Sequence, residues 1–312
     1  MTPESGFPEA FVRRLDTILP PGILRGTVAA MAGPQAVGFR VNSLKATVDK
    51  VLAGLPVDAE PLPWLPGAFV VPAGHRQPLL DSDAFATGAI WIQNPSSMIP
   101  PVVLAPEAGE SVLDLAAAPG SKTLQIACAM GPGADIAAVE VARPRFYRLK
   151  RNLRAQGAAW VKTFHRDGVT VPRYRADHFD RVLIDAPCST EAQMRPDDPA
   201  SFAHWSEKKV RTMAGKQRRL LEAAVRCARP GGVIVYSTCS FAPEENEMVV
   251  QHVLECFGDE VAIEPIALDI PGRLPGLPGW KDAEFDGSLS RAMRVLPDGV
   301  YEAFFVCRLR KR

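Results

Sequence analysis

Short apolar segments alternate with amphipathic segments from residue 111 to residue 238, and this alternation restricts the fold of the 312-residue chain more than any other feature. Period and length predict strands at 111–115, 135–140, 159–165, 179–185 and 231–237, and helices at 121–130, 143–157 and 206–229. Repeated strand–helix units of this kind form a parallel sheet with helices on both faces. We therefore expect an α/β fold.

A different pattern precedes this region. Residues 8–53 predict helices around one short extended piece, "VGFRVNSL", and six prolines between positions 56 and 78 argue against long regular elements there. We therefore expect a small α+β domain at 1–80 and a larger domain at 81–312.

The net charge of +1 does not by itself indicate a nucleic-acid-binding protein. The basic residues are nevertheless clustered: residues 141–175 hold ten Lys and Arg against one acid, and residues 205–229 hold eight against two. Such clusters form either ordinary solvated helix faces or surfaces that contact phosphates. The pattern alone leaves both interpretations open.

The six cysteines contain no Cys-x-x-Cys pair, and no Cys/His cluster has zinc spacing, so no bound metal is expected. The first sixteen residues lack the apolar core of a signal peptide, and no apolar run is long enough to span a membrane. We expect a cytoplasmic, monomeric protein with reduced thiols.

Polar or reactive residues follow every predicted strand, at the edge where parallel sheets bind ligands. They are "AAAPGSKT" after the first strand, Glu140, Asp167, "DAPCST" and "STCS". The small residues of "AAAPGSKT" let the backbone approach a ligand, and the following helix start offers N–H groups to an anion. With Glu140 available for ribose hydroxyls, this end suits either a dinucleotide or S-adenosylmethionine.

Two cysteines and a carboxylate, Cys188, Cys239 and Asp185, follow the fourth and fifth strands. A buried cysteine is more often a small core residue, but two thiols beside a carboxylate also suit covalent catalysis. Methylation at cytosine C5 needs such a set. A thiolate adds to C6, C5 attacks a methyl sulfonium, and loss of the C5 proton then expels the thiol. Spacing alone does not tell the roles of the two cysteines apart.

The segments "DLAAAPGSKT", "DAPCST" and "YSTCSFAPEENE" closely resemble the signatures of the Sun/Fmu (NOL/NOP/Sun) family of S-adenosylmethionine-dependent RNA cytosine-C5 methyltransferases. "FRVNSLK", "IWIQNPSSM", "LLEAAVRCARPGG" and "EAFFVCRLRK" also have family counterparts, so the resemblance covers most of residues 39–312. The form "AAAPGSKT" is most similar to the bacterial 16S ribosomal RNA branch. We expect this chain to lack the C-terminal RNA-binding domain of larger members of that branch.

The resemblance implies a Rossmann-like class I methyltransferase fold for residues 81–312, with a seven-stranded, mostly parallel sheet flanked by helices. Residues 1–80 would then be an accessory domain that binds RNA. The implied reaction transfers a methyl group from S-adenosylmethionine to cytosine C5 in RNA, either rRNA or tRNA, through a covalent cysteine–C6 adduct. The target base must leave its stack to react.

The resemblance also implies a role for each matching residue at the reacting end. Cys239 would be the nucleophile that attacks C6, and Cys188 would assist release of the methylated product. Asp185 would bind near N3 and N4 of the cytosine and near the methionine end of the cofactor. Lys122 would hold the methionine moiety and line the base pocket.

At the cofactor end, Glu140 would bind the ribose, Asp167 the adenine amino group, and Arg145 would support the cofactor side. The cofactor-binding residues implied by the resemblance are Ala116, Ala117, Ala118, Pro119, Gly120, Ser121, Lys122, Glu140, Arg145, Asp167 and Asp185.

The chain departs from the family pattern beside the expected substrate channel. Thr190 stands where the family usually has glycine after Asp-Ala-Pro-Cys-Ser, and Arg195-Pro196 stands where many members have Arg-Lys. Three other functions remain as alternatives. They are a noncatalytic RNA-binding or ribosome assembly factor, an enzyme acting on small molecules, and a methyltransferase acting on an exocyclic amino group.

Overall fold

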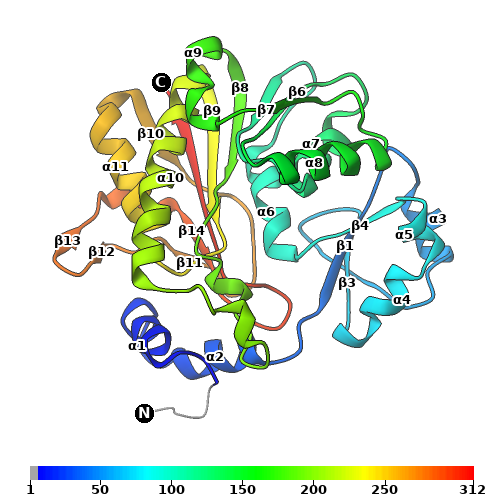
Figure 1. Ribbon diagram of the computed structural model, residues 1–312, viewed down its shortest axis with the longest axis horizontal. Helices are drawn as coiled ribbons and strands as arrows, with labels where there is room; N and C mark the ends of the chain where they lie inside the picture. Colours follow the sequence, from blue (N-terminus) through cyan, green and yellow to red (C-terminus); the bar gives the residue numbers. More distant parts are fainter. Residues whose placement is uncertain (1–5) are drawn as a thin grey trace.

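Nine strands form one mixed sheet in the larger part of this computed structural model, which describes residues 6–312 (Figure 1). Five neighbouring strands run parallel, in the order β9–β8–β5–β6–β7. Their bounds are β5 Ser111–Asp114, β6 Asp135–Glu140, β7 Lys162–His165, β8 Phe179–Asp185 and β9 Ala228–Thr238. The prediction of an α/β fold with a parallel central sheet is confirmed.

Antiparallel strands extend this sheet beyond β9. β15, Phe304–Lys311, pairs with β9 along one edge, and its other edge is shared by β14 and β10. β14 and β10 are short and pair with different parts of that edge, and the two-residue strand β11 pairs with β14. The sheet therefore has nine strands rather than the seven expected. The remaining bounds are β10 Val261–Glu264, β11 Leu274–Pro275 and β14 Met293–Val295.

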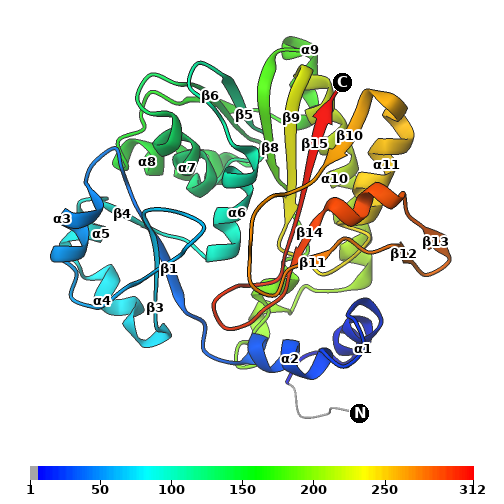
Figure 2. The ribbon, with the colours of Figure 1, turned by 180° about the vertical axis from the view of Figure 1, so that it is seen from behind.

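Different helices cover the two faces of the sheet (Figure 1, Figure 2). Along β8, Val182 and Ile184 belong to the core cluster on the α10 side, whereas Leu183 belongs to the cluster on the opposite side. The helices on the first side are α9 Pro172–Arg175, α10 Glu207–Cys227 and α11 Glu247–Phe257. Those on the second side are α6 Pro95–Leu104, α7 Ser121–Met130 and α8 Arg143–Ala155.

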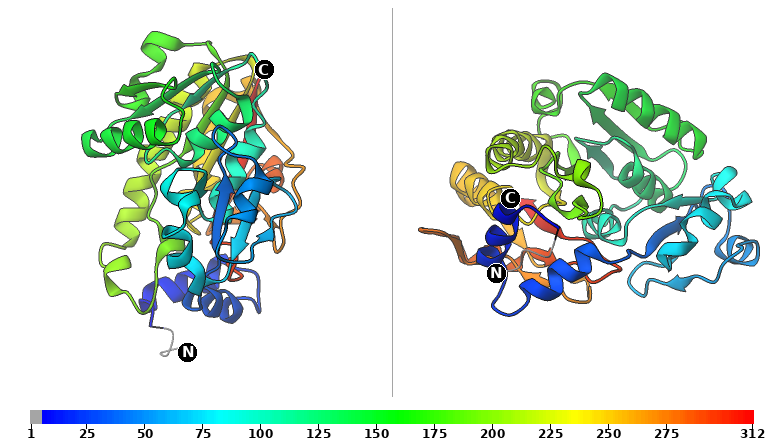
Figure 3. Two further views of the ribbon diagram at one scale, coloured as in Figure 1. Left: turned by 90° about the vertical axis from the view of Figure 1, so that its right-hand side faces the viewer. Right: turned by 60° about the horizontal axis from the view of Figure 1, so that its bottom comes forward.

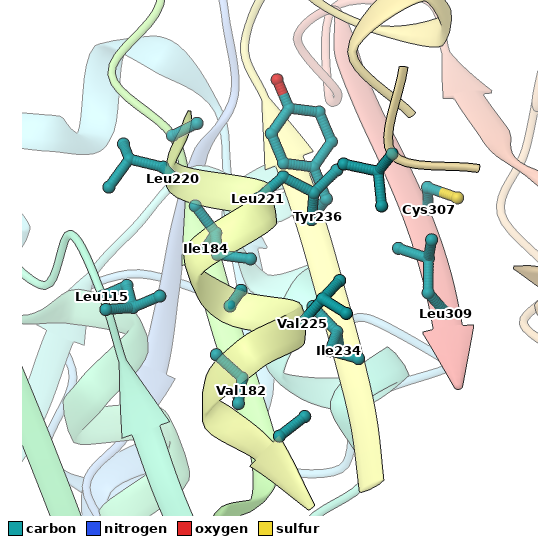
Figure 4. Packing of buried hydrophobic residues seen from close by; sticks show 14 of the residues in the cluster. Leu115, Val182, Ile184, Leu220, Leu221, Val225, Ile234, Tyr236, Cys307 and Leu309 are labelled. Carbon is teal, nitrogen blue, oxygen red and sulfur yellow. The ribbon is translucent and has the colours of Figure 1, made fainter. Parts of the chain in front are cut away.

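The apolar side of α10 packs directly onto the central strands. Figure 4 shows Leu221 and Val225 of α10 beside Tyr236 and Ile234 of β9, and all four side chains are fully buried. Burying side chains of this size stabilises the fold by roughly 1.5–3 kcal/mol each before conformational entropy is subtracted. This packing fixes the orientation of α10 relative to the strand ends.

A smaller antiparallel sheet, in the order β2–β3–β1–β4, forms beside the large one (Figure 1, Figure 2). Its strands are β1 Val37–Val41, β2 Glu60–Pro61, β3 Ala68–Val71 and β4 Ile90–Ile92. Three short helices accompany it, α3 Val48–Ala53, α4 Arg76–Leu80 and α5 Asp83–Ala86. The short elements at 60–80 agree with the proline-rich sequence there. The division of the chain after residue 80 stays a prediction.

Two N-terminal helices, α1 Glu9–Ile18 and α2 Leu24–Ala32, lie at the lower end of the large sheet, opposite the end of β15 (Figure 3). Phe11 of α1 packs against Phe241, just after β9, and against Trp205, just before α10. A small hairpin, β12 Gly279–Trp280 and β13 Ala283–Glu284, lies nearby. No helix within residues 6–312 has the length and apolar character to cross a membrane.

Candidate active site

A cavity of about 740 Å³ opens where the parallel strands β5, β6, β8 and β9 end. Ala117 and Gly120 belong to the loop between β5 and α7, which forms one of its walls, and both are buried. The other residues that the sequence predicts for the site line the cavity: Ala116, Ala118, Pro119, Ser121, Lys122, Glu140, Arg145, Asp167, Asp185, Cys188 and Cys239.

The two predicted reactive thiols face each other at this edge. β8 and β9 are parallel neighbours in which Asp185 pairs with Ser237, and this register places the Cys188 and Cys239 sulfurs 3.1 Å apart. The hydrogen bond to Cys188 and burial raise the pKa of the Cys239 thiol well above its usual value, while Lys122 acts in the opposite direction. Cys239 therefore needs assistance to lose its proton.

An ion pair between a buried lysine and a half-buried aspartate lies beside the thiols. The Lys122 ammonium of α7 is 2.7 Å from Asp185 Oδ2 and donates to Ser97 Oγ at 2.6 Å. Ser237 donates to the other Asp185 oxygen at 3.0 Å. Because a buried charge is tolerated only when it is paired and hydrogen-bonded, this network fixes both charged groups at the cavity wall. It joins the start of α7 to the ends of β8 and β9.

The loop between β5 and α7 is held from outside by three side chains. Arg145 donates to the carbonyl of Ala118 at 2.6 Å, Asn152 to that of Pro119 at 2.8 Å, and Arg40 of β1 to that of Ser121 at 3.1 Å. The loop contains a cis peptide before Pro119.

Gly120 in the same loop has φ of 107°, a left-handed conformation. A Cβ on Gly120 would lie 3.0 Å from a methyl group of Leu149. Only glycine therefore suits both the backbone conformation and the packing at this position.

Two acidic residues line the opposite part of the cavity. Glu140 ends β6, is 4% exposed, and accepts the N–H of Ala142 at 2.8 Å. Its second oxygen lies 3.7 Å from Arg145 Nε. Asp167 accepts the N–H of Val169 at 3.1 Å and so caps the short helical turn that follows it. Both carboxylates therefore border the cavity.

Two further carboxylates hold the thiol-bearing turns, and sequence reasoning missed both. Glu191, three residues after Cys188, accepts the N–H groups of Phe241 and Ala242, just after Cys239, at 2.9 and 3.1 Å. It is 1% exposed and also accepts from Ser240 Oγ and Trp205 Nε1. The segment after one cysteine thus fixes the turn that carries the other.

The reciprocal contact comes from Glu245, which lies six residues after Cys239 and is fully buried. It accepts the N–H of Ser189 at 2.9 Å and the side-chain amide of Gln217 at 3.0 Å, and Gln217 also donates to the carbonyl of Pro187. Burial raises the pKa of Glu245 to about 7, although Ser189 and Gln217 act in the opposite direction. No sequence pattern marks this pairing, because it arises only when the two turns meet.

The side of α10 that faces the strand ends supplies another wall of the cavity. Its amphipathic period predicted Leu220 on the apolar side, which is confirmed, whereas Met213 is half-buried and borders the cavity. Sequence reasoning assigned no site role to the cavity-lining residues Ser97, Thr190, Gln193, Lys209, Met213, Lys216, Arg219 and Leu220. The basic cluster at 205–229 was the available signal for the three cations among them.

A family model described as 16S rRNA methyltransferase RsmB/F matches residues 101–310. A second model, described as the N-terminal domain of 16S rRNA methyltransferase RsmF, matches residues 7–95. Together the two matches extend over most of the chain.

Similar proteins include ribosomal RNA small subunit methyltransferase F of Serratia proteamaculans, which is 37% identical over 314 residues, covering 97% of this chain and 63% of the relative. The chain therefore spans less than two thirds of that relative. The tRNA (cytosine(49)-C(5))-methyltransferase of Pyrococcus abyssi is 36% identical over 282 residues, covering 89% of each protein.

Among solved structures, a methyltransferase homolog protein from Pyrococcus horikoshii superposes with a TM-score of 0.85 at 32% identity, covering 100% of this chain and 97% of that one. NSun6 from Pyrococcus horikoshii with SFG superposes with a TM-score of 0.82 at 21% identity, covering 98% of this chain and 99% of that one. The second likeness supports the fold alone.

Proposed function

The chain belongs to the RsmB/F family of 16S rRNA methyltransferases, and from this premise we propose that it transfers a methyl group from S-adenosylmethionine to C5 of a cytosine in RNA. The observation that carries the proposal is the pair of thiols 3.1 Å apart beside the Lys122–Asp185 ion pair. An enzyme that methylates an exocyclic amino group has no use for two facing thiols.

The residues at the other end of the cavity fit S-adenosylmethionine. The Glu140 carboxylate can accept from ribose hydroxyls, and the first N–H groups of α7 have no side-chain cap, so they are open to the methionine carboxylate. Ala116 to Lys122 would enclose the methionine moiety, Arg145 would hold that loop, and Asp167 would bind the adenine amino group. S-Adenosylmethionine supplies an electrophilic methyl group on a sulfonium.

In the proposed reaction Cys239 Sγ loses its proton and adds to cytosine C6. The Asp185 carboxylate, whose charge acts on this thiol, takes that proton and passes it to N3 of the cytosine, which returns it to the thiol when the S–C6 bond breaks. As the S–C6 bond forms, the C5=C6 electron pair becomes available at C5, which takes the methyl group. A proton at N3 and the Lys122 ammonium stabilise the negative charge that the addition places on the ring. Removal of the C5 proton restores the double bond and breaks the S–C6 bond, with Cys188 assisting product release.

The basic side of α10 supports an RNA substrate. Lys209, Lys216 and Arg219 line the cavity wall opposite the cofactor loop, where phosphates flanking an unstacked cytosine would pass. The Serratia proteamaculans relative is named for ribosomal RNA and the Pyrococcus abyssi relative for tRNA, so both RNA classes are proposed for testing.

Methyl transfer to RNA tests this proposal. The protein is incubated with labelled S-adenosylmethionine and separate pools of unmodified rRNA, small-subunit particles and tRNA, and the product nucleosides are identified after digestion. We expect 5-methylcytidine from one pool with the unaltered protein and none with Cys239→Ala. Label at a different atom would contradict the proposed chemistry. Tight RNA binding with no transfer to any pool would favour a noncatalytic assembly factor.

A further inference from the structure

A group of side chains of types that can ligate a metal lies outside the cavity, on the surface where α10 and α11 pack together (Figure 1, Figure 2). Glu222 belongs to α10, whereas His252 and Cys256 belong to α11. We propose that these three residues bind a divalent transition-metal ion, with Zn²⁺ as the best match to their chemistry.

The three ligand atoms converge on one point. His252 and Cys256 are four residues apart on α11 and therefore share one helix face. His252 Nε2 lies 2.9 Å from Glu222 Oε1 and 3.5 Å from Cys256 Sγ, and all three ligand atoms lie within 4.8 Å of one another. An ion bonded at about 2.0–2.3 Å to each ligand needs ligand atoms roughly 3–4 Å apart. Small side-chain rotations achieve this.

The donor types select the class of metal. A thiolate, an imidazole and a carboxylate together suit Zn²⁺ and similar transition metals, whereas Ca²⁺ and Mg²⁺ prefer oxygen donors alone. Three protein ligands leave a fourth tetrahedral position for water. Binding replaces the Cys256 thiol proton by the ion, so a proton is released and affinity rises with pH.

The surroundings orient the carboxylate and leave the site open to solvent. Arg226, one turn after Glu222, donates to its other oxygen at 3.3 Å and lies over the Phe257 ring at 5.5 Å. This contact directs Oε1 toward His252, while the positive charge of Arg226 weakens cation binding. The His252 side chain is 30% exposed and Cys256 is exposed, so an ion can reach the site without opening the fold.

The site would join two helices that the cavity depends on. Arg219 and Leu220 of α10 line the cavity within one turn of Glu222, and α11 begins just after Glu245, which holds the Cys188 turn. A bound ion would therefore fasten the cavity wall to α11. Because the ion lies outside the cavity, it stabilises the fold without taking part in methyl transfer.

Cobalt binding tests the proposal, because a thiolate ligand gives Co²⁺ a charge-transfer absorption that oxygen and nitrogen ligands lack. Metal-free reduced protein is titrated with Co²⁺, and bound Co²⁺ is then displaced with Zn²⁺. Cys256→Ser should lose the charge-transfer band, and His252→Ala should bind at least about tenfold more weakly. Cys128→Ser, which removes a half-buried thiol elsewhere, is the matched control and should keep the band.

The facing thiols of the cavity are the main competing site, so Cys188→Ala/Cys239→Ala is titrated in parallel. The proposal requires this double variant to keep one equivalent of bound Co²⁺. Zn²⁺ should also raise the Tm of the unaltered protein by several degrees and leave that of Cys256→Ser unchanged. A band that survives in Cys256→Ser and disappears in the double variant would overturn the proposal. So would the absence of both cobalt binding and a zinc-dependent Tm shift in the unaltered protein.

Discussion

Cys307 lies within β15, and Cys239 directly follows the neighbouring strand β9, yet the two thiols have different surroundings. Cys307 pairs with Tyr236 in the middle of the sheet and packs in the apolar core, where burial raises its pKa (Figure 4). Cys239 lies one residue past the end of β9, facing a second thiol and close to the Lys122–Asp185 pair. The same residue type is a small core side chain in one place and a candidate nucleophile in the other.

Replacing each cysteine by alanine should separate these roles most strongly. We expect Cys239→Ala to lower methyl transfer by at least about a thousandfold, because a covalent route loses its nucleophile, with a small change in stability. Cys307→Ala should keep the rate and lower the free energy of unfolding by about 1–2 kcal/mol. Single-turnover transfer and urea denaturation measure the two quantities. A folded Cys307→Ala that is as inactive as Cys239→Ala would contradict the comparison.

Removing the cation near Cys239 should give the next largest effect. In Lys122→Met we expect methyl transfer to fall by about a hundredfold and alkylation of Cys239 to move to higher pH, because a nearby positive charge favours the thiolate. The rate of alkylation is measured against pH in proteins that also carry Cys188→Ala, so that Cys239 is the cavity thiol that is alkylated. Lys162→Met, which breaks an exposed pair with Asp135 at 2.7 Å, is the control and should change neither quantity. An unchanged alkylation profile in Lys122→Met would remove Lys122 from thiol activation.

The carboxylate that holds the Cys188 turn should give the protein a pH-dependent stability. Burial raises the pKa of Glu245 from 4.5 to about 7, so the folded state favours its protonated form. Its contribution to the free energy of unfolding, up to roughly 3 kcal/mol, is complete below pH 4.5. This contribution is lost as the pH rises through about 7.

We expect Glu245→Gln to reduce this fall in the free energy of unfolding between pH 4.5 and pH 7. Urea denaturation over the pH range measures the difference from the unaltered protein. Glu255→Gln, at an exposed position on α11, should follow the unaltered protein. Equal pH dependence in Glu245→Gln and the unaltered protein would show that Glu245 is not the responsible group.

The smallest expected effect is at Thr190, two residues after Cys188. Thr190 has φ of 60°, a left-handed conformation that a β-branched residue rarely adopts, at the position where the family usually has glycine. Thr190→Gly should stabilise the fold by up to about 1 kcal/mol. Thr87→Gly, at φ of −81°, should instead lower stability. If Thr190→Gly also lowers stability, the hydroxyl contact to Ser189 outweighs the strain.

The sequence was sufficient to predict the central strands and helices, but not the short strands at the antiparallel edge of the large sheet. The predicted bounds of α7, β6 and β8 agree with the structure because each carries a clear apolar period between polar ends. β9 begins at Ala228 rather than 231, because the chain passes from α10 into the strand without a separate loop. β11 and β14 were missed because strands of two and three residues carry no recognisable period.

The candidate site could be assembled from the sequence because all parallel strands end at one edge. That rule brought Lys122, Asp185 and both thiols together without any knowledge of distances. It could not supply Glu191 and Glu245, because each holds a turn some fifty residues away in the chain. Such contacts depend on how β8 and β9 align, which local sequence does not encode.

Trapping the covalent adduct tests the central claim most directly. Cys188→Ala, Cys239→Ala and the double variant are incubated with S-adenosylmethionine and RNA, and denaturing gels are examined for protein–RNA adducts. If Cys239 attacks C6 and Cys188 assists release, Cys188→Ala accumulates an adduct that the double variant does not form. An adduct in Cys239→Ala but not in Cys188→Ala would reverse the two roles. If an RNA pool that is methylated by the unaltered protein gives no adduct with either single variant, the covalent account is contradicted.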